Sequence, residues 1–340
     1  MKRLLAAALL LSAAARPVAA AAAATELTVY TALEADQIKA YEASFEKAHP
    51  DVKIRWVRDS TGIVTAKLLA EKANPQADVV LGLAATSLML LDKEKLLAPY
   101  APKGLEKLKA SMRDPASPPR WVGMDVWASA ICFNTIEAKK RNIPAPTSWA
   151  DLTKPEYRGQ IVMPNPASSG TGYLMVSAWQ QLLGAQKAWT YMDALDKNVA
   201  TYTHSGSKPC KQAAAGEFVV GLSFDYRANA SKRDGAPIDV ILPKEGLGWD
   251  MEAAGIVATT KKLDAAKKLL DWAVSPEANE LYAKNFAVVA IPGIQHKLEH
   301  VPGDVEGMLA KNDFAFAASQ RERILGEWSR RYDAKSEPKK

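Results

Sequence analysis

The alternation of short apolar runs with amphipathic segments is the feature that most constrains the fold of this chain. The runs at 27–31, 52–57 and 78–83 have the length and composition of buried strands. The segment 35–48 carries apolar residues at helical spacing, and 62–72 forms a second helix before the third run. Strands that alternate with helices in this way predict a parallel sheet. Ligands of such sheets bind in the loops that follow the carboxyl ends of the strands.

A second α/β unit follows the first. The apolar stretch 121–134 predicts a crossing from one lobe to the other, and 251–258 predicts the return, because the helix-rich remainder has no sheet of its own. The predicted fold class is therefore α/β, with two α/β lobes joined by a hinge of two crossings. Residues 25–128 and 255–340 are expected to form lobe 1, and residues 129–254 to form lobe 2. A ligand would bind in the cleft between the lobes.

The N-terminus has the pattern of a secretion signal, predicted here as residues 1–24. A basic start, Met1-Lys2-Arg3, precedes an apolar run at 4–15, and the small residues at 18–24 offer cleavage sites. The run is too short to span a bilayer comfortably, which favours a cleaved signal over the alternative of a retained anchor. We therefore expect the mature protein to lie outside the cytoplasmic membrane.

The charge of the chain argues against a nucleic acid as partner. The formal net charge of +6 falls to +3 when Lys2, Arg3 and Arg16 of the predicted signal are removed. The remaining basic residues are spread over several helices and do not form a stripe interleaved with aromatic residues. This composition is typical of a mildly basic globular protein.

The two cysteines, Cys132 and Cys210, allow at most one intramolecular disulfide. The compartment outside the cytoplasm would permit the bond. Nothing in the sequence brings the two residues together, however, and a disulfide needs its Cα atoms within about 7 Å. We expect free, buried thiols.

Two similar phrases place hydroxyl groups and a glycine at the start of a helix. Residues 59–67 read DSTGIVTAK, and residues 168–173 read SSGTGY. Such a terminus attracts anions, because its first N–H groups are unpaired and the helix dipole is positive there. A third loop, THSGS at 203–207, precedes another short helix. The alternative is that the hydroxyls only cap their helices, but their occurrence in both lobes favours an anion site.

Several segments carry a family resemblance. The stretch TSWADL at 147–152, which continues to PNP at 164–166, and the phrase GWDMEAAG at 248–255 resemble the extracellular solute-binding proteins of ABC importers. Within the branch of ferric-ion, polyamine and phosphonate binders, WVRDSTG at 56–62 and GLAATS at 82–87 are most similar to the 2-aminoethylphosphonate-binding proteins. The resemblance covers nearly all of the mature chain.

The resemblance implies a bilobal, type 2 periplasmic-binding fold that closes around its ligand without chemistry. The ligand would be 2-aminoethylphosphonate or a similar aminoalkylphosphonate, and an inner-membrane ABC permease would receive it. We accordingly expect a periplasmic monomer without catalytic residues, cofactor or bound metal. Another small solute on the same fold, such as ferric ion, a polyamine or an inorganic anion, stays open as an alternative.

An aminoalkyl ligand also needs a carboxylate for its ammonium group. Four acids near the predicted cleft could serve, and three aromatic side chains could flank the cation: Glu34, Asp225, Asp250 and Glu252, with Trp127, Tyr226 and Trp249. The alternative for each acid is a surface charge or a salt bridge in the hinge. The phrase FDYR at 224–227 resembles the place where ferric binders carry paired tyrosines, but only one tyrosine stands here. This departure argues against iron, which prefers several phenolate or carboxylate oxygens, and leaves Tyr226 free to donate to an anion.

The predicted binding residues come from the rim loop after the first strand, from the three hydroxyl-bearing phrases and from the residues proposed for the ammonium group. They are Thr31, Glu34, Ser60, Thr61, Gly62, Trp127, Ser168, Ser169, Gly170, Thr171, Ser207, Asp225 and Tyr226.

An enzyme remains a second alternative. His296-Lys297-Leu298-Glu299-His300 matches the H-x-x-E-H pattern of inverted zinc peptidases, in which two histidines on one helix face hold zinc and the glutamate acts as base. The segment lies between Pro-Gly pairs at 292–293 and 302–303, which leave room for barely two helical turns. No third ligand with suitable spacing stands out, so the pattern favours chance over catalysis.

Overall fold

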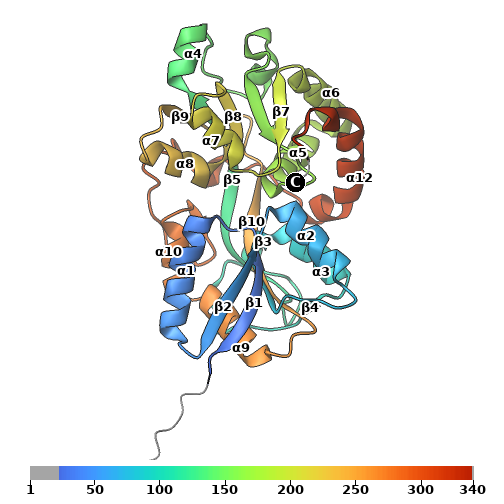
Figure 1. Cartoon of the computed structure of the whole chain (residues 1–340), viewed down its shortest axis with the longest axis vertical. Coiled ribbons are helices and arrows are strands. Elements are labelled where there is room, and N and C mark those ends of the chain that lie inside the picture. The colour runs from blue at the N-terminus through green and yellow to red at the C-terminus, as the bar shows by residue number, and fades with distance from the viewer. Residues whose placement is uncertain (1–22, 339–340) are drawn as a thin grey trace, which may run out of the picture.

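The computed structural model describes residues 23–338, so nearly all of the predicted signal at 1–24 lies outside the described residues. Two lobes are stacked along the long axis of the molecule (Figure 1). Within residues 23–338, no helix is long and apolar enough to cross a membrane. The predicted arrangement in two lobes is confirmed.

The first lobe contains the parallel sheet that the sequence predicts. Its strands are β1 (Thr25–Thr31), β2 (Val52–Arg58) and β3 (Val79–Ala84), and the two-residue β4 (Leu97–Ala98) pairs antiparallel with the later strand β10 (Trp249–Val257). Strand β1 lies in the middle and pairs in parallel with β2 and β3. The helices of this lobe are α1 (Ala35–Ala48), α2 (Thr61–Ala70), α3 (Ala85–Lys93), α9 (Leu263–Ala273) and α10 (Pro276–Ala283), with 3₁₀ turns at Leu105–Lys107 and Ala110–Met112.

The second lobe has its own sheet. The strands are β6 (Ile161–Pro164), β7 (Val199–Thr203), β8 (Val220–Phe224) and β9 (Ile238–Ile241), and β6 pairs in parallel with β7 and β8. The helices are α4 (Thr135–Arg141), α5 (Gly170–Leu183), α6 (Ala185–Asp196), α7 (Lys208–Ala214) and α8 (Asp225–Arg233), with 3₁₀ turns at Ala150–Thr153 and Pro155–Tyr157. Each lobe thus presents strand ends and helix starts to the boundary between the lobes.

Two long strands join the lobes. Strands β5 (Val122–Asn134) and β10 (Trp249–Val257) pair antiparallel with each other and run from one lobe into the other (Figure 1). The lower part of β5 also pairs with β11 (Val288–Val289), and its upper part pairs with β8 and β9. These are the two crossings that the sequence predicts.

The chain passes between the lobes a third time, which the sequence did not indicate. After β11 it returns to the second lobe, where Leu298, Val301 and Val305 pack in the same apolar cluster as Cys132. The short α11 (Val305–Met308) belongs to this segment. The connection between the lobes is therefore made of two paired strands and one irregular segment.

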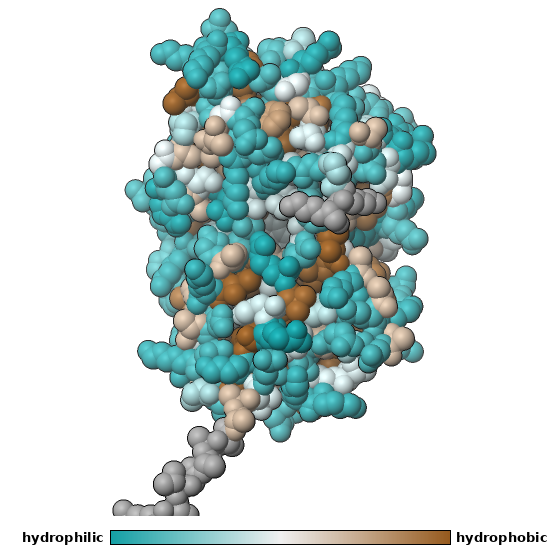
Figure 2. All heavy atoms as spheres, in the orientation of Figure 1, coloured by the Kyte–Doolittle hydropathy of each residue, from teal (hydrophilic) through white to brown (hydrophobic). Residues whose placement is uncertain are grey.

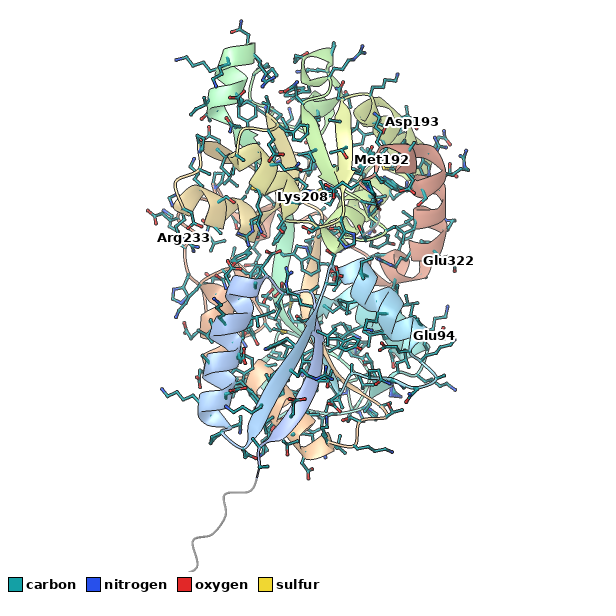
Figure 3. All side chains as sticks on the ribbon, in the orientation of Figure 1. Glu94, Met192, Asp193, Lys208, Arg233 and Glu322 are labelled. Carbon is teal, nitrogen blue, oxygen red and sulfur yellow. A yellow bond between two sulfur atoms is a disulfide. The ribbon has the colours of Figure 1, made fainter. Side chains whose placement is uncertain are left out.

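The last helix, α12 (Phe314–Tyr332), followed by a 3₁₀ turn at Asp333–Lys335, contacts α3 of the first lobe and also packs on the second lobe. The prediction placed all of 255–340 in lobe 1 and did not include this packing on the second lobe. Trp328 is buried against Tyr202 of β7, with ring centroids 4.8 Å apart. Asp193 of α6 lies beside α12 (Figure 3), where its carboxylate accepts hydrogen bonds from Arg331. The apolar residues along one face of the helix pack in the second core.

The two cysteines form a disulfide, which corrects the expectation of free thiols. Cys132 of β5 is bonded to Cys210 of α7, with the Cα atoms 5.3 Å apart. The residues are 78 positions apart in the chain, so only the folded second lobe brings them together. The bond fixes α7 to the crossing strand.

Candidate functional site

A cavity of about 280 Å³ lies between the lobes. Figure 2 shows hydrophobic residues gathered around the waist of the molecule, between two ends covered mainly by hydrophilic residues. The lining comes from the loops after β1, β2 and β3 of the first lobe, from the starts of α5 and α7 in the second, and from the crossing strands. The lining residues are Ala32, Glu34, Gln37, Arg58, Asp59, Ser60, Thr61, Gly82, Ala84, Trp127, Ser169, Gly170, Thr171, His204, Ser205, Gly206, Ser207, Lys211, Phe224 and Glu252.

The start of α2 forms one wall of the cavity. Ser60 is the residue before the first turn, yet its side chain makes no capping hydrogen bond. Among the described residues, the hydroxyls of Ser60 and Thr61 have no hydrogen-bond partner, although both residues line the cavity. The expected alternative, that these hydroxyls only cap the helix, does not describe this end of α2. They are available to a ligand.

The start of α5 faces α2 from the second lobe. Ser169 caps this helix, because its hydroxyl oxygen accepts a hydrogen bond from the N–H of Gly172 at 3.3 Å. Here the capping alternative holds. Thr171 is different: its hydroxyl lines the cavity and has no partner within the described part of the chain. The N–H groups of Gly170 and Thr171 belong to the first turn, which leaves them without acceptors in the helix.

The third hydroxyl-bearing loop completes this side. Ser205, Gly206 and Ser207 line the cavity ahead of α7. A Cβ on Gly206 would lie 2.5 Å from the hydroxyl oxygen of Thr171, so only glycine allows the loop to approach α5 this closely. The disulfide Cys132–Cys210 holds the helix that follows.

The lobes touch on the side of α2 and α5. The N–H of Gly62 donates to the carbonyl of Ser168 across the boundary at 2.8 Å, and Asp59 lies 3.2 Å from the imidazole Nε2 of His204. Ser168 uses its own hydroxyl to donate to the carbonyl of His204. Gly62 and Ser168 were predicted to bind the ligand. The structure places them beside the cavity and outside its lining, where they join the two lobes.

The lobes also touch on the opposite side, between α1 and α8 (Figure 1). Arg227 of α8 forms an ion pair with Glu34, 2.9 Å away. Tyr226 donates its hydroxyl to the carboxylate of Asp36. The prediction left Tyr226 free to donate to an anion, but this hydroxyl is already engaged and Tyr226 does not line the cavity. With contacts on both sides, the structure is in a closed conformation.

Two predicted residues are buried behind the lining. Thr31 accepts a hydrogen bond from the N–H of Leu33 and shapes the loop after β1. Asp225 accepts from the N–H groups of Ala128 and Tyr226, and burial raises its pKa to about 7. Asp250, considered for the ammonium group, accepts from the hydroxyl of Thr86 at 2.6 Å and lies outside the lining. These three side chains have structural partners.

Two basic side chains in the lining were not predicted from the sequence. Arg58, the last residue of β2, donates through Nε to the carbonyl of Leu33 and lies 3.5 Å from a carboxylate oxygen of Glu34. Lys211 of α7 is 4.0 Å from the same carboxylate. The position of Arg58 at a strand end, directly before the DSTG phrase, was a signal that could have identified it.

The floor of the cavity is acidic. Glu252 of β10 lines it and lies directly opposite Asp125 of β5 in the strand register. Burial raises the pKa of both carboxyls, that of Glu252 to about 8. Trp127, also on β5, supplies an aromatic wall next to this pair, together with Phe224.

The H-x-x-E-H pattern is not arranged for zinc. Residues 296–300 lie in an irregular segment, so the two histidines do not share a helix face. His296 instead lies 2.9 Å from the carboxylate of Glu280. Within residues 23–338 no group of three or more His, Cys, Asp or Glu side chains is placed to hold a metal ion.

The comparisons with known proteins place the chain in a family. A family model for bacterial extracellular solute-binding proteins matches residues 74–316, and the chain belongs to this family. It is 33% identical over 234 residues to an uncharacterized protein of Haemophilus influenzae, 68% of either chain. It is 29% identical over 293 residues to a probable ABC transporter periplasmic-binding protein of Sinorhizobium fredii, which covers 83% of this chain and 78% of the relative.

A solved structure agrees with this assignment. The periplasmic binding protein AfuA of Actinobacillus pleuropneumoniae, with fructose-6-phosphate bound, superimposes with a TM-score of 0.84 at 29% identity, over 91% of this chain and 99% of AfuA. The chain is a periplasmic solute-binding protein of the ABC-importer type. Such proteins bind a small molecule and deliver it to a membrane permease, and both the relative in Sinorhizobium fredii and AfuA carry the name of a periplasmic binding protein.

Proposed function

We propose that this protein captures a small organic phosphonate, with 2-aminoethylphosphonate as its ligand, for an ABC importer. The observation that carries the proposal is the unpartnered hydroxyls of Ser60, Thr61 and Thr171, which converge on one cavity from the helix starts of both lobes. Hydroxyl and N–H donors at helix starts hold phosphate-type anions. A hydrogen bond to a charged acceptor contributes about 1.5–3 kcal/mol.

The basic side chains in the lining support an anionic ligand. Arg58 and Lys211 bring positive charge to the same cavity from opposite lobes. Both also lie near Glu34, so the anion would share them with this carboxylate. An anion that contacts donors of both lobes favours the closed conformation, because it binds that state more tightly than the open one.

Two acids in the lining support an amine on the ligand. Glu34 and Glu252 both line the cavity, and Trp127 offers a ring face beside them. A cation next to carboxylates and an aromatic ring is stabilised by charge and by the ring quadrupole. Inorganic phosphate would leave these two acids without a cationic partner.

A sugar phosphate is the second candidate, because AfuA was solved with fructose-6-phosphate. It would use the same phosphate wall, and the acids would accept from its hydroxyls. Iron and polyamines are less well supported, although an Fe(3+)-binding protein of Serratia marcescens and a spermidine/putrescine-binding protein of Escherichia coli are relatives at 24% and 29% identity. Tyr226 is engaged by Asp36, and a polyamine has no anionic group for the hydroxyl wall.

The role in transport follows from the family. The mature protein acts in the periplasm after removal of the N-terminal signal, as a monomer whose single chain supplies every wall of the cavity. It delivers its ligand to an inner-membrane ABC permease, and closure involves no chemical step. Arg227–Glu34 and Gly62–Ser168 hold the closed form that the permease would meet.

Calorimetric titration of the mature protein tests the proposal. We expect tight binding of 2-aminoethylphosphonate and weaker binding of ethylphosphonate, phosphate, fructose-6-phosphate and spermidine. Thr171→Ala together with Ser60→Ala should weaken binding at least tenfold, whereas Ser319→Ala, on the exposed face of α12, should leave it unchanged. Tighter binding of fructose-6-phosphate would identify a sugar phosphate as the ligand instead of 2-aminoethylphosphonate. Lack of binding to every phosphorus compound would refute the proposal.

A further inference from the structure

The floor of the cavity is formed by two acids on the strands that join the lobes. Asp125 of β5 and Glu252 of β10 are direct partners in the antiparallel register. Side chains of opposed residues project from the same face, with Cβ atoms about 4.5–5.5 Å apart. The exposed fraction is 0% for Asp125 and 9% for Glu252, so water has little access to the pair. Of the two, Glu252 lines the cavity.

The polar atoms of this floor lack partners. Within the described residues, Glu252 Oε2 and both carboxyl oxygens of Asp125 accept no hydrogen bond. Gln37 is also a lining residue, and its buried Nε2 has no acceptor among the described residues, although its side-chain oxygen accepts from the N–H of Glu34. Buried polar atoms in folded proteins nearly always have partners. Apart from a proton shared between the two carboxyls, the described residues supply no donor for these oxygens, so the floor can accept a polar group from a ligand.

The charges around Glu252 show what kind of group would fit. The titratable side chains that face it are acids and phenols from the neighbouring elements: Asp125 on β5, Asp225 at the start of α8, Glu34 before α1, Tyr41 on α1 and Tyr282 on α10. Arg227 and Lys211 are directed to Glu34. Burial raises the pKa of Glu252 to about 8, although a hydrogen bond with Asp125 lowers it, and the charges of Glu34 and Asp225 also raise it. At pH 7 the floor thus holds a proton and lacks a cation.

We propose that Glu252, backed by Asp125, binds the ammonium group of the ligand and that binding releases a proton from this carboxyl pair. The inference rests on the proposed function, since it assigns the end of the ligand opposite the phosphonate. In the ligand-free protein the carboxyl is neutral. When the ammonium group arrives, Glu252 becomes a carboxylate, the ion pair forms, and the proton passes to the buffer.

A proton count separates an ammonium group from a hydroxyl group. A hydroxyl can donate to a neutral or ionised carboxyl and leaves the proton in place, whereas an ammonium group stabilises only the ionised form. The site would then discriminate by charge. Because a proton must leave, the affinity for the amine should rise with pH up to about pH 8.

The test is calorimetric titration of the mature protein at pH 7 in two buffers with different ionisation enthalpies. The probes are 2-aminoethylphosphonate, 2-hydroxyethylphosphonate and propylphosphonate, and the proton release of each is corrected for the second ionisation of its own phosphonate group, measured in the same buffers. We expect release of about one proton with the amine beyond that seen with the other two. The amine should also bind at least tenfold more tightly.

Two variants complete the test. Glu252→Gln keeps the size of the side chain and should abolish the extra proton release and the preference for the amine, while propylphosphonate still binds and so reports that the cavity is folded. Glu322→Gln, on the exposed face of α12 (Figure 3), is the matched control and should behave as the parent protein. Asp125→Asn should lower the proton release and leave the phosphonate wall intact.

The outcomes distinguish this inference from the proposed function. Equal binding of the three phosphonates with equal proton release would overturn the ammonium site and leave the phosphonate site standing. Extra proton release that persists in Glu252→Gln would assign the proton to another group. Failure of all three phosphonates to bind would instead refute the proposed function, and the ammonium site with it.

Discussion

The backbone N–H of Gly62 donates to the carbonyl oxygen of Ser168 at 2.8 Å, and this hydrogen bond joins the start of α2 in one lobe to the loop before α5 in the other. The approach requires glycine. A Cβ at Gly62 would lie 2.1 Å from the carbonyl oxygen of Ala167, and a Cβ at Gly170 would lie 2.6 Å from the hydroxyl oxygen of Thr61. Glycines at both helix starts therefore allow the lobes to close.

Replacement of Gly62 should separate ligand binding from folding. Gly62→Ala introduces a clash with backbone atoms only when the lobes are closed, so we expect the ligand to bind at least tenfold more weakly, about 1.4 kcal/mol or more. Thermal unfolding of the ligand-free protein should change little, because Gly62 makes this contact only across the boundary. Small-angle scattering with saturating ligand should show a more open molecule than the parent protein.

The control for this prediction is Gly326→Ala. Gly326 lies within α12, and a Cβ there would meet no atom within 4 Å. Alanine should leave ligand affinity unchanged and raise the stability slightly, since it favours a helix over glycine by about 0.8–1 kcal/mol. Parental affinity in Gly62→Ala would show that the ligand does not bind the closed form seen here.

Much of the fold follows from the sequence by local rules. In residues 25–84 the period of the apolar residues and the length of each segment are enough to identify the strands and helices. The parallel β2-β1-β3 order was found where expected. The crossing strands were also predicted, because a long apolar run between two sheets is typical of a strand that continues from one sheet into the other. The third crossing was not, since residues 290–313 have no regular period that indicates their lobe.

Contacts between distant residues limited the remaining predictions. The apolar face of α12 shows that the helix is buried, but no local pattern tells whether the first or the second core receives it. The same holds for Cys132 and Cys210, which only the folded lobe brings together. For the site, the hydroxyl phrases identified the lining of both lobes, while Tyr226 was misjudged because its partner Asp36 lies 190 positions away.

The disulfide should contribute strongly to stability. A bond that closes a loop of this length restricts the unfolded chain, and loss of a native disulfide costs about 2–5 kcal/mol. We expect the double variant Cys132→Ala, Cys210→Ala to unfold at a lower urea concentration, and its free energy of unfolding should be lower by this amount. Ligand affinity should also fall, because α7 and the loop with Ser207 are held to β5 by the bond.

Reductant provides the control for the disulfide. Dithiothreitol should move the urea transition of the parent protein towards that of the double alanine variant, and it should have no effect on the variant itself. Equal transitions with and without reductant in the parent protein would contradict a stabilising bond.

The packing of α12 predicts that Trp328 stabilises the second lobe. Its ring is buried against Tyr202 and Tyr332. Trp328→Ala should lower the free energy of unfolding by about 3–5 kcal/mol, the usual cost of removing a large buried aromatic side chain. Hydrogen exchange should increase in β7 and α6 before β1 and β2. The reverse order, with the first lobe exposed earlier, would contradict the packing of Trp328 in the second core.

The buried acids predict that the ligand-free protein loses stability as the pH rises. Burial raises the pKa of Asp250 to about 6, that of Asp225 to about 7 and that of Glu252 to about 8, well above the value near 4 that such carboxyls have in an unfolded chain. Between pH 4 and these values, the folded state binds more protons than the unfolded state. The free energy of unfolding should then fall by about 1.4 kcal/mol per pH unit for each carboxyl within its window.

Urea titrations from pH 5 to pH 8.5 measure this dependence. Asp225→Asn should remove its share of the slope below pH 7, because the asparagine oxygen can still accept the N–H groups of Ala128 and Tyr226 while no proton is exchanged. Glu322→Gln, whose carboxylate is exposed, should retain the full slope. A stability that rises with pH over this range would mean that these carboxyls are ionised in the folded protein. In that case the proton release assigned to Glu252 would also be excluded.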